Sequence, residues 1–423
     1  MSALLSTWGA LAGLAVAIVL IMRKFPPAYA LILGAVTGGL IGGGGLVPTV
    51  NTMIEGSRGM IPGILRILAS GVLAGALIRT GSAAKMADAI VGGLGVRFAL
   101  PAVAVATMII CSVGVFIDIS VITVAPVALA VGRKAELPVP ALLLAMIGGG
   151  KAGNIISPNP NTIAVADAFR VDLTSLMGQN LVPALAALVV TLLLAVWLGR
   201  RRYAQPPASN LSDDAVDSSG DLERPPLVNA LAGPLLVVVL LALRPLFKIA
   251  VDPLIALPAG GLMTILATGH AREMVAIAEF GLSKVTGVAI LLLGTGTIAG
   301  IIKASGLNGD MIALLRTCRL PAFALAPISG ILMAGATAST TAGATVAAQT
   351  FSGALLESGV PALSAAAMIH AGATVVDSLP HGSFFHATGG SVFMSVRERL
   401  RLIPCEAAIG LASTLAAVIC HVL

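Results

Sequence analysis

Long stretches without an acidic or basic residue alternate with short polar connections along this chain. A helix of about twenty apolar residues spans the hydrocarbon core of a bilayer. The pattern therefore predicts an all-α, polytopic membrane protein. The charge-free stretches cover residues 1–22, 25–54, 98–117, 173–199, 225–243, 253–269, 285–302, 320–356, 358–376, 378–396 and 407–423, and residues 59–78 add one more with a single charge at Arg66.

One segment near the middle of the chain breaks this pattern. Residues 200–227 hold a run of three arginines, several prolines and serines, and a cluster of acidic residues. Such a composition is typical of a solvated linker, because it has too little apolar surface to pack. The sequence therefore predicts two membrane domains of similar length, residues 1–199 and 228–423.

The two halves repeat one another. Small and helix-breaking residues of the first half recur in the same order in the second, first at a shift of 225 and later after small gaps. Chance similarity is the alternative, because Ala, Gly and Leu are abundant, but the ordered Gly and Pro positions favour an internal duplication. The recurring pairs include Gly71 with Gly296, Gly75 with Gly300, Gly81 with Gly306, Pro101 with Pro321, Pro140 with Pro361, Gly150 with Gly372 and Pro158 with Pro380.

Each half also contains a hydrophobic stretch that glycine interrupts, residues 98–132 and 321–356. We expect these to form re-entrant helical hairpins that enter and leave the membrane on one side. About five transmembrane helices plus one hairpin per half would follow, and an odd number of crossings makes the two repeats inverted. Most of the 25 basic residues then lie on the cytoplasmic side, with the linker cytoplasmic and both termini extracytoplasmic.

Composition narrows the class of protein further. Apolar residues make up 57% of the chain and charged residues 10%, whereas a soluble domain has about 25% charged residues. This difference excludes a soluble enzyme. The net charge of +6 comes from basic residues in the connections, where membrane topology accounts for them, so nucleic-acid binding gains no support.

Four helix breaks at the membrane midplane are expected, in residues 114–123, 148–162, 335–345 and 370–383. A broken helix is tolerated at this depth only where it faces protein or a water-filled cavity. Helix N-termini at such breaks attract carboxylates. The alternative to ligand binding is that each Ser or Thr hydroxyl donates a hydrogen bond to a backbone carbonyl one turn earlier in its own helix. The candidate substrate-binding residues are Ser120, Lys151, Asn154, Ser157, Asn159, Asn161, Thr162, Ser339, Thr340, Thr341 and Ser378.

Ionisable residues at membrane depth are costly and are therefore candidates for function. Lys151 is a candidate for binding a substrate carboxylate, and a lysine that reaches the interface is the alternative. Asp118, Asp377, His370 and His381 are candidates for proton coupling, because burial and neighbouring charges bring such groups into the neutral pH range. Alternatively, Asp118 pairs permanently with Lys151, and the histidines are hydrogen-bonded core residues.

Enzyme chemistry finds little support in the sequence. No two histidines have the four-residue spacing with an adjacent Glu that metalloprotease helices require, so we expect no metal site. No serine lies in a nucleophile-elbow motif, no phosphate-binding glycine loop is present, and no cofactor is expected. An intramembrane enzyme is therefore a distant alternative to a transporter.

About 70 residues of the second half resemble the gluconate permease (GntP) family, within the wider ion transporter superfamily. The segments that resemble it are residues 339–345, 366–374, 377–390 and 397–404. The resemblance implies a proton symporter for sugar acids or related hydroxy-carboxylates in a bacterial inner membrane. It also implies inverted repeats with paired hairpins, and a homodimer whose transport domains move against a scaffold.

The first half departs from the family pattern. Residues 157–162 read Ser-Pro-Asn-Pro-Asn-Thr, where gluconate permeases are expected to have a Pro-Pro-His-Pro type of segment, and Lys151 precedes them. The substrate therefore stays open among gluconate, shorter hydroxy acids such as glycerate or 3-hydroxybutyrate, and di- or tricarboxylates. The additional lysine favours an organic anion over a zwitterion.

The sequence thus predicts proton-coupled uptake of a small organic anion. Uptake of an anion against the membrane potential requires a coupled cation, because each elementary charge costs about 2.3 kcal/mol per 100 mV. The alternative is sodium coupling, with backbone carbonyls of the helix breaks and Asn154 or Asn161 as ligands.

Overall fold

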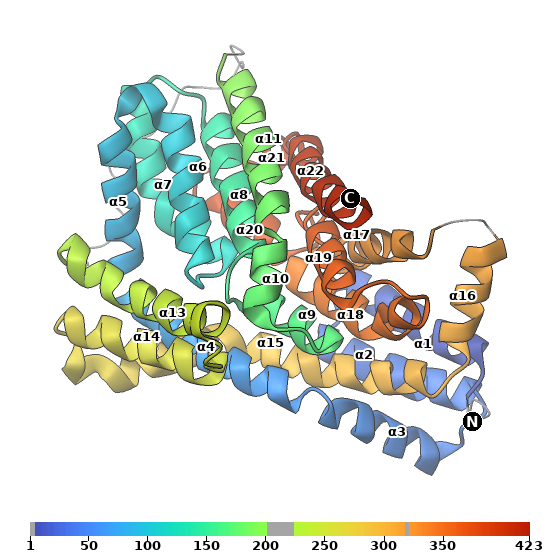
Figure 1. Cartoon of the computed structure of the whole chain (residues 1–423). Helices are drawn as coiled ribbons and strands as arrows, with labels where there is room; N and C mark the ends of the chain where they lie inside the picture. The colour runs from blue at the N-terminus through green and yellow to red at the C-terminus, as the bar shows by residue number, and fades with distance from the viewer. Residues whose placement is uncertain (1–4, 201–223, 318–320) are drawn as a thin grey trace.

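A computed structural model describes residues 5–200, 224–317 and 321–423. Within these ranges the regular elements are helices (Figure 1). The predicted linker, residues 200–227, lies almost entirely outside the described residues. Six described helices are long and apolar enough to cross a membrane, or seven if the bent pair Ser82–Leu94 and Val96–Ser112 forms one span, and five apolar helices are shorter. The all-helical membrane fold is confirmed, and the count of ten crossings stays a prediction.

The first half consists of α1 to α11. The bounds are α1 (Thr7–Met22), α2 (Pro27–Ile41), α3 (Leu46–Arg58), α4 (Ile61–Arg79), α5 (Ser82–Leu94), α6 (Ala99–Ser112), α7 (Ile117–Lys134), α8 (Val139–Ile155), α9 (Pro160–Phe169), α10 (Leu173–Gln179) and α11 (Leu181–Arg200).

The second half follows the same order with fewer interruptions. Its helices are α13 (Leu227–Phe247), α14 (Pro253–Ala267), α15 (Met274–Lys303), α16 (Leu307–Thr317), α17 (Leu325–Thr337), α18 (Thr340–Glu357), α19 (Ala362–Gly372), α20 (Ser383–Gly390), α21 (Val396–Leu400) and α22 (Ile403–Val422). The continuous α15 stands where the first half has the two helices α3 and α4. This order agrees with a duplication, while the inverted orientation stays a prediction.

Two helices that the hydrophobic pattern did not reveal, α5 and α16, precede the hairpins. Both contain charged residues, for example Lys85 and Asp88 in α5, so a search for charge-free stretches passes over them. The chain bends by 107° between α5 and the helical segment that ends at Ser112. These helices therefore connect the first layer of each half to its hairpin.

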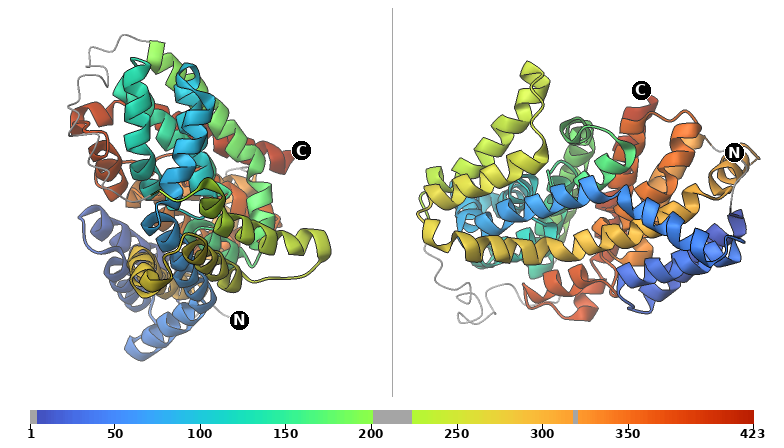
Figure 2. Two further views of the ribbon diagram at one scale, coloured as in Figure 1. Left: turned by 90° about the vertical axis from the view of Figure 1, so that its left-hand side faces the viewer. Right: turned by 90° about the horizontal axis from the view of Figure 1, so that it is seen from below.

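A layer built around α15 forms one side of the molecule. Figure 1 shows α15 running across the lower part of the protein beneath α5 to α8, and the right-hand view of Figure 2 shows α15 alongside α3 and α4. Small residues allow this contact: a Cβ built on Gly71 of α4 would lie 2.8 Å from the carbonyl oxygen of Gly281 of α15. Close backbone packing of this kind is the usual way in which membrane helices associate.

Both interrupted stretches fold as helical hairpins. In the second half, α17 ends at Thr337 and α18 begins at Thr340, and a Cβ on Gly343 would lie 2.4 Å from the Cα of Ala334. Residues on either side of the turn therefore pack against each other. In the first half, α6 and α7 likewise pack together around a turn in which Gly114 has φ +111°, a conformation that favours glycine.

Helix α8 lies at the centre of the upper layer. Every residue from Pro140 to Ile155 is buried, because α6, α7 and α11 pack around it. A helix that is apolar on all sides is expected to be enclosed in this way. The same helix contains Lys151, so the fold places this charge in the protein interior and away from lipid.

Candidate functional site

All four predicted helix breaks are present. They comprise residues 113–116 between α6 and α7, 156–159 between α8 and α9, 338–339 between α17 and α18, and 373–382 between α19 and α20. Two of the following helices have a side-chain cap. Asn159 caps α9 and Ser339 caps α18, each accepting hydrogen bonds from backbone N–H groups of the first turn.

The four breaks meet at one cavity of about 760 Å³. Phe116, Ile117 and Asp118 come from the first hairpin, and residues 337–342 come from the second. The broken helix of the first half contributes Asn161 to the lining. The broken helix of the second half contributes Asp377, residues 381–384 and His386. Residues of α15 and of the connection between α1 and α2 complete the wall. The cavity therefore lies between the hairpin tips and the α15 layer.

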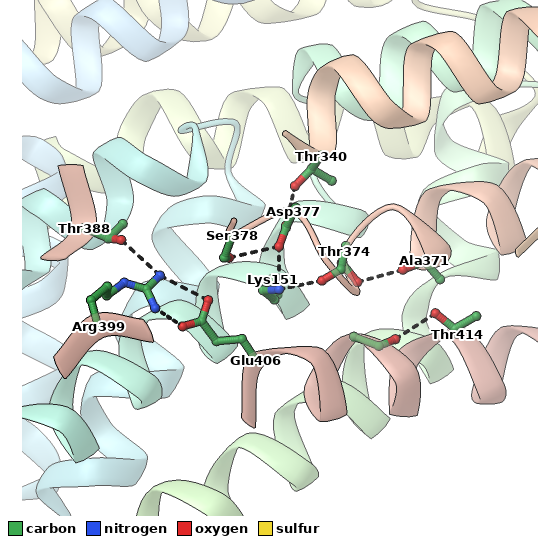
Figure 3. A network of polar contacts seen from close by, with 11 residues as sticks. Lys151, Thr340, Ala371, Thr374, Asp377, Ser378, Thr388, Arg399, Glu406 and Thr414 are labelled. Carbon is green, nitrogen blue, oxygen red and sulfur yellow. Dashed lines mark hydrogen bonds and ion pairs between the residues drawn. The ribbon is translucent and has the colours of Figure 1, made fainter. Parts of the chain in front are cut away.

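A buried ion pair joins the two halves beside this cavity. Lys151 Nζ of α8 lies 2.6 Å from Asp377 Oδ1, and the two side chains are 1% and 2% exposed (Figure 3). Lys151 Nζ also donates a hydrogen bond to the backbone oxygen of Thr374, at 2.5 Å. Lys151 is thus paired with Asp377, and the alternative of a pair with Asp118 is not what the structure contains.

Asp377 is held by three donors. In addition to Lys151, the Thr340 hydroxyl at the start of α18 donates to Oδ2 at 2.6 Å, and the Ser378 hydroxyl donates to Oδ1 at 3.0 Å. Burying a charge requires such partners, because an unpaired carboxylate in a protein interior is strongly destabilising. One carboxylate therefore connects α8, the second hairpin and the α19–α20 break.

The polar residues of the α8–α9 break bond mainly to one another. Asn159 Nδ2 donates to the backbone oxygen and to Oδ1 of Asn154, at 2.9 and 2.7 Å. Asn161 Nδ2 donates to the same Asn154 Oδ1 at 3.0 Å. The backbone N–H groups of Asn161 and Thr162 both donate to the side-chain oxygen of Asn159. Asn154, Asn159, Asn161 and Thr162 thus form one hydrogen-bonded group, called the amide network below.

One hydrogen bond links this network to the second half: the Thr341 hydroxyl donates to Asn161 Oδ1 at 2.5 Å. Ser120 bonds back to the backbone oxygen of Phe116, as the alternative for hydroxyls in membrane helices anticipated. Ser157 is buried, and its hydroxyl has no hydrogen-bond partner among the described residues.

The histidines occupy three different settings. His370 of α19 is completely buried, and neither ring nitrogen has a hydrogen-bond partner within the described part of the chain. His381 lines the cavity, with Nε2 at 3.3 Å from the backbone oxygen of Ala336. His386, which the sequence analysis did not select for transport, lines it too and approaches the backbone oxygen of Pro380 at 2.7 Å.

The structure separates the predicted site residues into two groups. Those that line the cavity are Asp118, Asn161, Ser339, Thr340, Thr341, Asp377 and His381. Those that stand behind its wall are Ser120, Lys151, Asn154, Ser157, Asn159, Thr162, His370 and Ser378. The first group is in position to contact a ligand directly, whereas the second group does not line this cavity.

Sequence reasoning missed two cations of the cavity wall, Lys24 and Lys284. Each borders a predicted charge-free stretch, residues 25–54 or 285–302, which places it in a connection by sequence alone. Lys24 does lie in the connection between α1 and α2, but Lys284 lies within the continuous helix α15. The position of Lys284 between the apolar segments 274–278 and 285–302 was the signal that α15 extends through it.

Two further charge clusters lie outside this cavity. Arg66 of α4 is paired with Asp167 of α9 and with Asp252, where the Arg66 Nη2 to Asp252 Oδ2 distance is 2.7 Å. Hydrogen bonding from Arg66 holds the pKa of the Asp252 carboxyl below its ordinary value. The second cluster is the buried pair of Arg399 and Glu406, drawn in Figure 3 with Thr388. The first cluster connects α4 to α9, and the second connects α21 to α22 and to α20.

Comparisons with known proteins agree with this architecture. The chain is 53% identical to an uncharacterized transporter of Haemophilus influenzae, over 97% of this chain and 96% of that protein. It is 24% identical to the D-serine transporter DsdX of Escherichia coli O6:H1 (strain CFT073), over 72% of this chain and 70% of the relative.

A solved structure shows a similar fold. The crystal structure of the YdaH transporter of Alcanivorax borkumensis superposes with a TM-score of 0.62, at 17% sequence identity, over 88% of this chain and 87% of that chain. The family model described as GntP family permease matches residues 5–422. The resemblance found in the second half thus extends over the whole chain, and the protein, a multi-pass membrane transporter and not an enzyme, belongs to the GntP family of permeases.

Proposed function

We propose that this permease takes up a small organic anion, such as gluconate or a related hydroxy-carboxylate, together with protons. The observation that supports the proposal best is the position of Asp377. Its carboxylate belongs to the cavity wall, and the same group neutralises the buried ammonium group of Lys151. A proton acceptor and a fixed positive charge are therefore in direct contact beside the candidate binding site.

This contact provides a physical reason for coupling. While Asp377 is ionised, the pair with Lys151 is neutral, and a substrate anion gains nothing from the lysine. When Asp377 accepts a proton, the Lys151 charge has no counter-charge in a low-dielectric surrounding, which is costly. An anion bound in the cavity supplies that counter-charge. Proton and anion binding thus favour each other, as symport requires.

Sodium coupling is less well supported by the amide network. The Asn154 side-chain oxygen already accepts hydrogen bonds from Asn159 and Asn161, and the Asn161 oxygen accepts one from Thr341. A sodium ion would have to displace these donors.

The test is uptake into liposomes that contain the purified protein, with an imposed inward proton gradient and no sodium. D-gluconate, D-glycerate and D-serine are the probes, the last because a relative transports it. We expect accumulation of a hydroxy-carboxylate that collapses when an ionophore dissipates the gradient. Uptake that follows a sodium gradient and ignores the proton gradient would contradict the proposal.

The location and assembly expected from the resemblance belong to the same proposal. It places the protein in the bacterial inner membrane, with the linker cytoplasmic, both termini extracytoplasmic, and two copies forming a homodimer. The two inverted repeats, residues 1–199 and 228–423, would then form transport domains that move against a scaffold and expose the cavity to each side of the membrane in turn.

A further inference from the structure

Lys284 lies within the continuous helix α15 and takes no part in the coupling between Asp377 and Lys151 proposed above. It is the eleventh residue of the 30-residue helix α15, so about 15 Å of helix precedes it. Lysines within apolar helices of membrane proteins almost always face a protein interior or a water-filled cavity, because exposure to lipid costs a few kcal/mol. The position of Lys284 therefore calls for a polar neighbour.

The cavity at the helix breaks is that neighbour. Lys284, Gly287, Val288 and Leu291 line it together, and their spacing of three and four residues places them on one face of α15. A Cβ built on Gly287 would find no atom within 4 Å, so the wall is open beside the lysine. Helix α15 also packs against α18, whose first residues carry the hydroxyls of the second hairpin tip.

The charges around Lys284 leave it available for a ligand. Within the described residues its ammonium group forms no ion pair, and it lies 4.7 Å from the centroid of the Phe280 ring. Asp118 is near enough to interact electrostatically, without direct contact. Asp377, the other carboxylate of the wall, is already occupied by Lys151.

The internal repeat shows that Lys284 has no counterpart. At the shift of 225 that relates Gly71 to Gly296, the equivalent of Lys284 is Gly59, at the interruption between α3 and α4. Lys284 therefore comes from the second half alone, and the other cation of the cavity wall, Lys24, lies in the connection between α1 and α2 of the first half.

We propose that Lys284 binds the carboxylate of the substrate and that the hydroxyls of Ser339, Thr340 and Thr341 face the rest of the molecule. This assignment rests on the proposed function in so far as the cavity binds a carboxylate. It gives Lys151 a different task, the counter-charge of Asp377. The substrate then lies between α15 and the second hairpin tip, in contact with both layers of the protein.

The first test compares Lys284→Gln with Lys284→Arg and with Lys303→Gln, a control at the exposed end of the same helix. Binding of D-gluconate, D-glycerate and D-serine is measured by titration of the purified proteins. We expect Lys284→Gln to weaken binding of the carboxylate at least tenfold, Lys284→Arg to retain part of it, and Lys303→Gln to match the wild type. Wild-type affinity in Lys284→Gln would overturn the assignment.

The second test does not depend on the choice of substrate. Lys284→Cys, in a variant without its native cysteines, is treated with a cationic and with an anionic methanethiosulfonate reagent. We expect both hydrophilic reagents to label the folded protein, because the residue faces water. A thiol that neither reagent reaches would place Lys284 against lipid and overturn the assignment. The cationic adduct should restore ligand binding, and the anionic adduct should not.

These tests separate the assignment from the proposed function. Wild-type protein that binds D-serine but neither hydroxy acid would contradict uptake of an organic anion, yet loss of D-serine binding in Lys284→Gln would still support the lysine. Conversely, proton-driven gluconate uptake that survives unchanged in Lys284→Gln would support the function and contradict the lysine.

Discussion

The two broken helices meet at one cavity but are built differently. Between α8 and α9 the break comprises four residues, and Asn159 both caps the following helix and bonds to Asn154. Between α19 and α20 it comprises residues 373–382, and Gly382, at the start of α20, provides no side-chain cap. Instead, a Cβ on Gly382 would lie 2.3 Å from the backbone oxygen of Ala338 in the hairpin tip.

The difference lies in where each break finds its hydrogen-bond partners and contacts. The first-half break forms most of its side-chain hydrogen bonds among its own residues, with one further hydrogen bond from Thr341 of the second half. The second-half break depends on contacts with other elements, through Asp377 and through the backbone of Gly382. We therefore expect a ligand or a proton that changes those contacts to affect the second break more than the first.

Removing one partner of the Lys151–Asp377 pair should have the largest effect. Lys151→Gln leaves a buried carboxylate, and Asp377→Asn leaves a buried ammonium group, so each should destabilise the protein by about 3–5 kcal/mol. Each should also abolish proton-driven accumulation. Denaturant unfolding in detergent measures the first effect, and liposome uptake measures the second.

The double variant Lys151→Gln/Asp377→Asn is the matched control for that prediction. It removes both charges together, so it should recover most of the stability without recovering uptake. If the double variant accumulates substrate like the wild type, the pair is structural only, and the second break has no special part in coupling.

Gly382→Ala tests the backbone contact of the second break. The added methyl group has to displace the hairpin tip at Ala338, and overpacking of this kind costs about 1–3 kcal/mol. Because the tip contains Ser339 and Thr340, the rate of uptake per folded protein should also fall. Gly390→Ala, at a glycine of α20 where an added Cβ would meet no atom within 4 Å, should leave both unchanged. Equal stability and equal uptake of the two variants would contradict a role for the contact between Gly382 and Ala338.

Asn159→Ala tests the network of the first break. It removes the α9 cap and two hydrogen bonds to Asn154, for an expected loss of about 1–3 kcal/mol. If the first break is a rigid support, the substrate affinity of the folded fraction should stay near the wild-type value. A variant that is fully stable but has altered affinity would show that the network contacts substrate.

Ser339→Ala should have the smallest effect. The Ser339 hydroxyl accepts a hydrogen bond from the backbone N–H of Ala342, and loss of such a cap costs about 1 kcal/mol. Ser339→Gly should cost the helix only a few tenths of a kcal/mol, because glycine is itself tolerated at this position. Unfolding in denaturant measures the stability of both variants. A decrease in affinity common to both would identify the hydroxyl as a substrate contact as well.

The helix breaks were predictable because their cause is local. Gly and Pro disfavour a helix, although α7 continues through Pro126, and Asn followed by Pro, as at Asn159 and Pro160, favours a helix start. Polar residues at such breaks indicated a cavity for the same reason. The partner of Lys151 was not predictable, because Asp118 and Asp377 are both buried acids in the sequence pattern and only the packing of α8 distinguishes them.

By itself, then, the sequence determined the membrane class, the four breaks and the family, since each depends on residue type and spacing along one chain. The tertiary structure decided which half contributes which group. It paired Lys151 with Asp377 across 226 positions, enclosed the asparagines in their own network and turned Lys284 toward the cavity. Charges choose partners by distance in space, and that distance is set by helix packing.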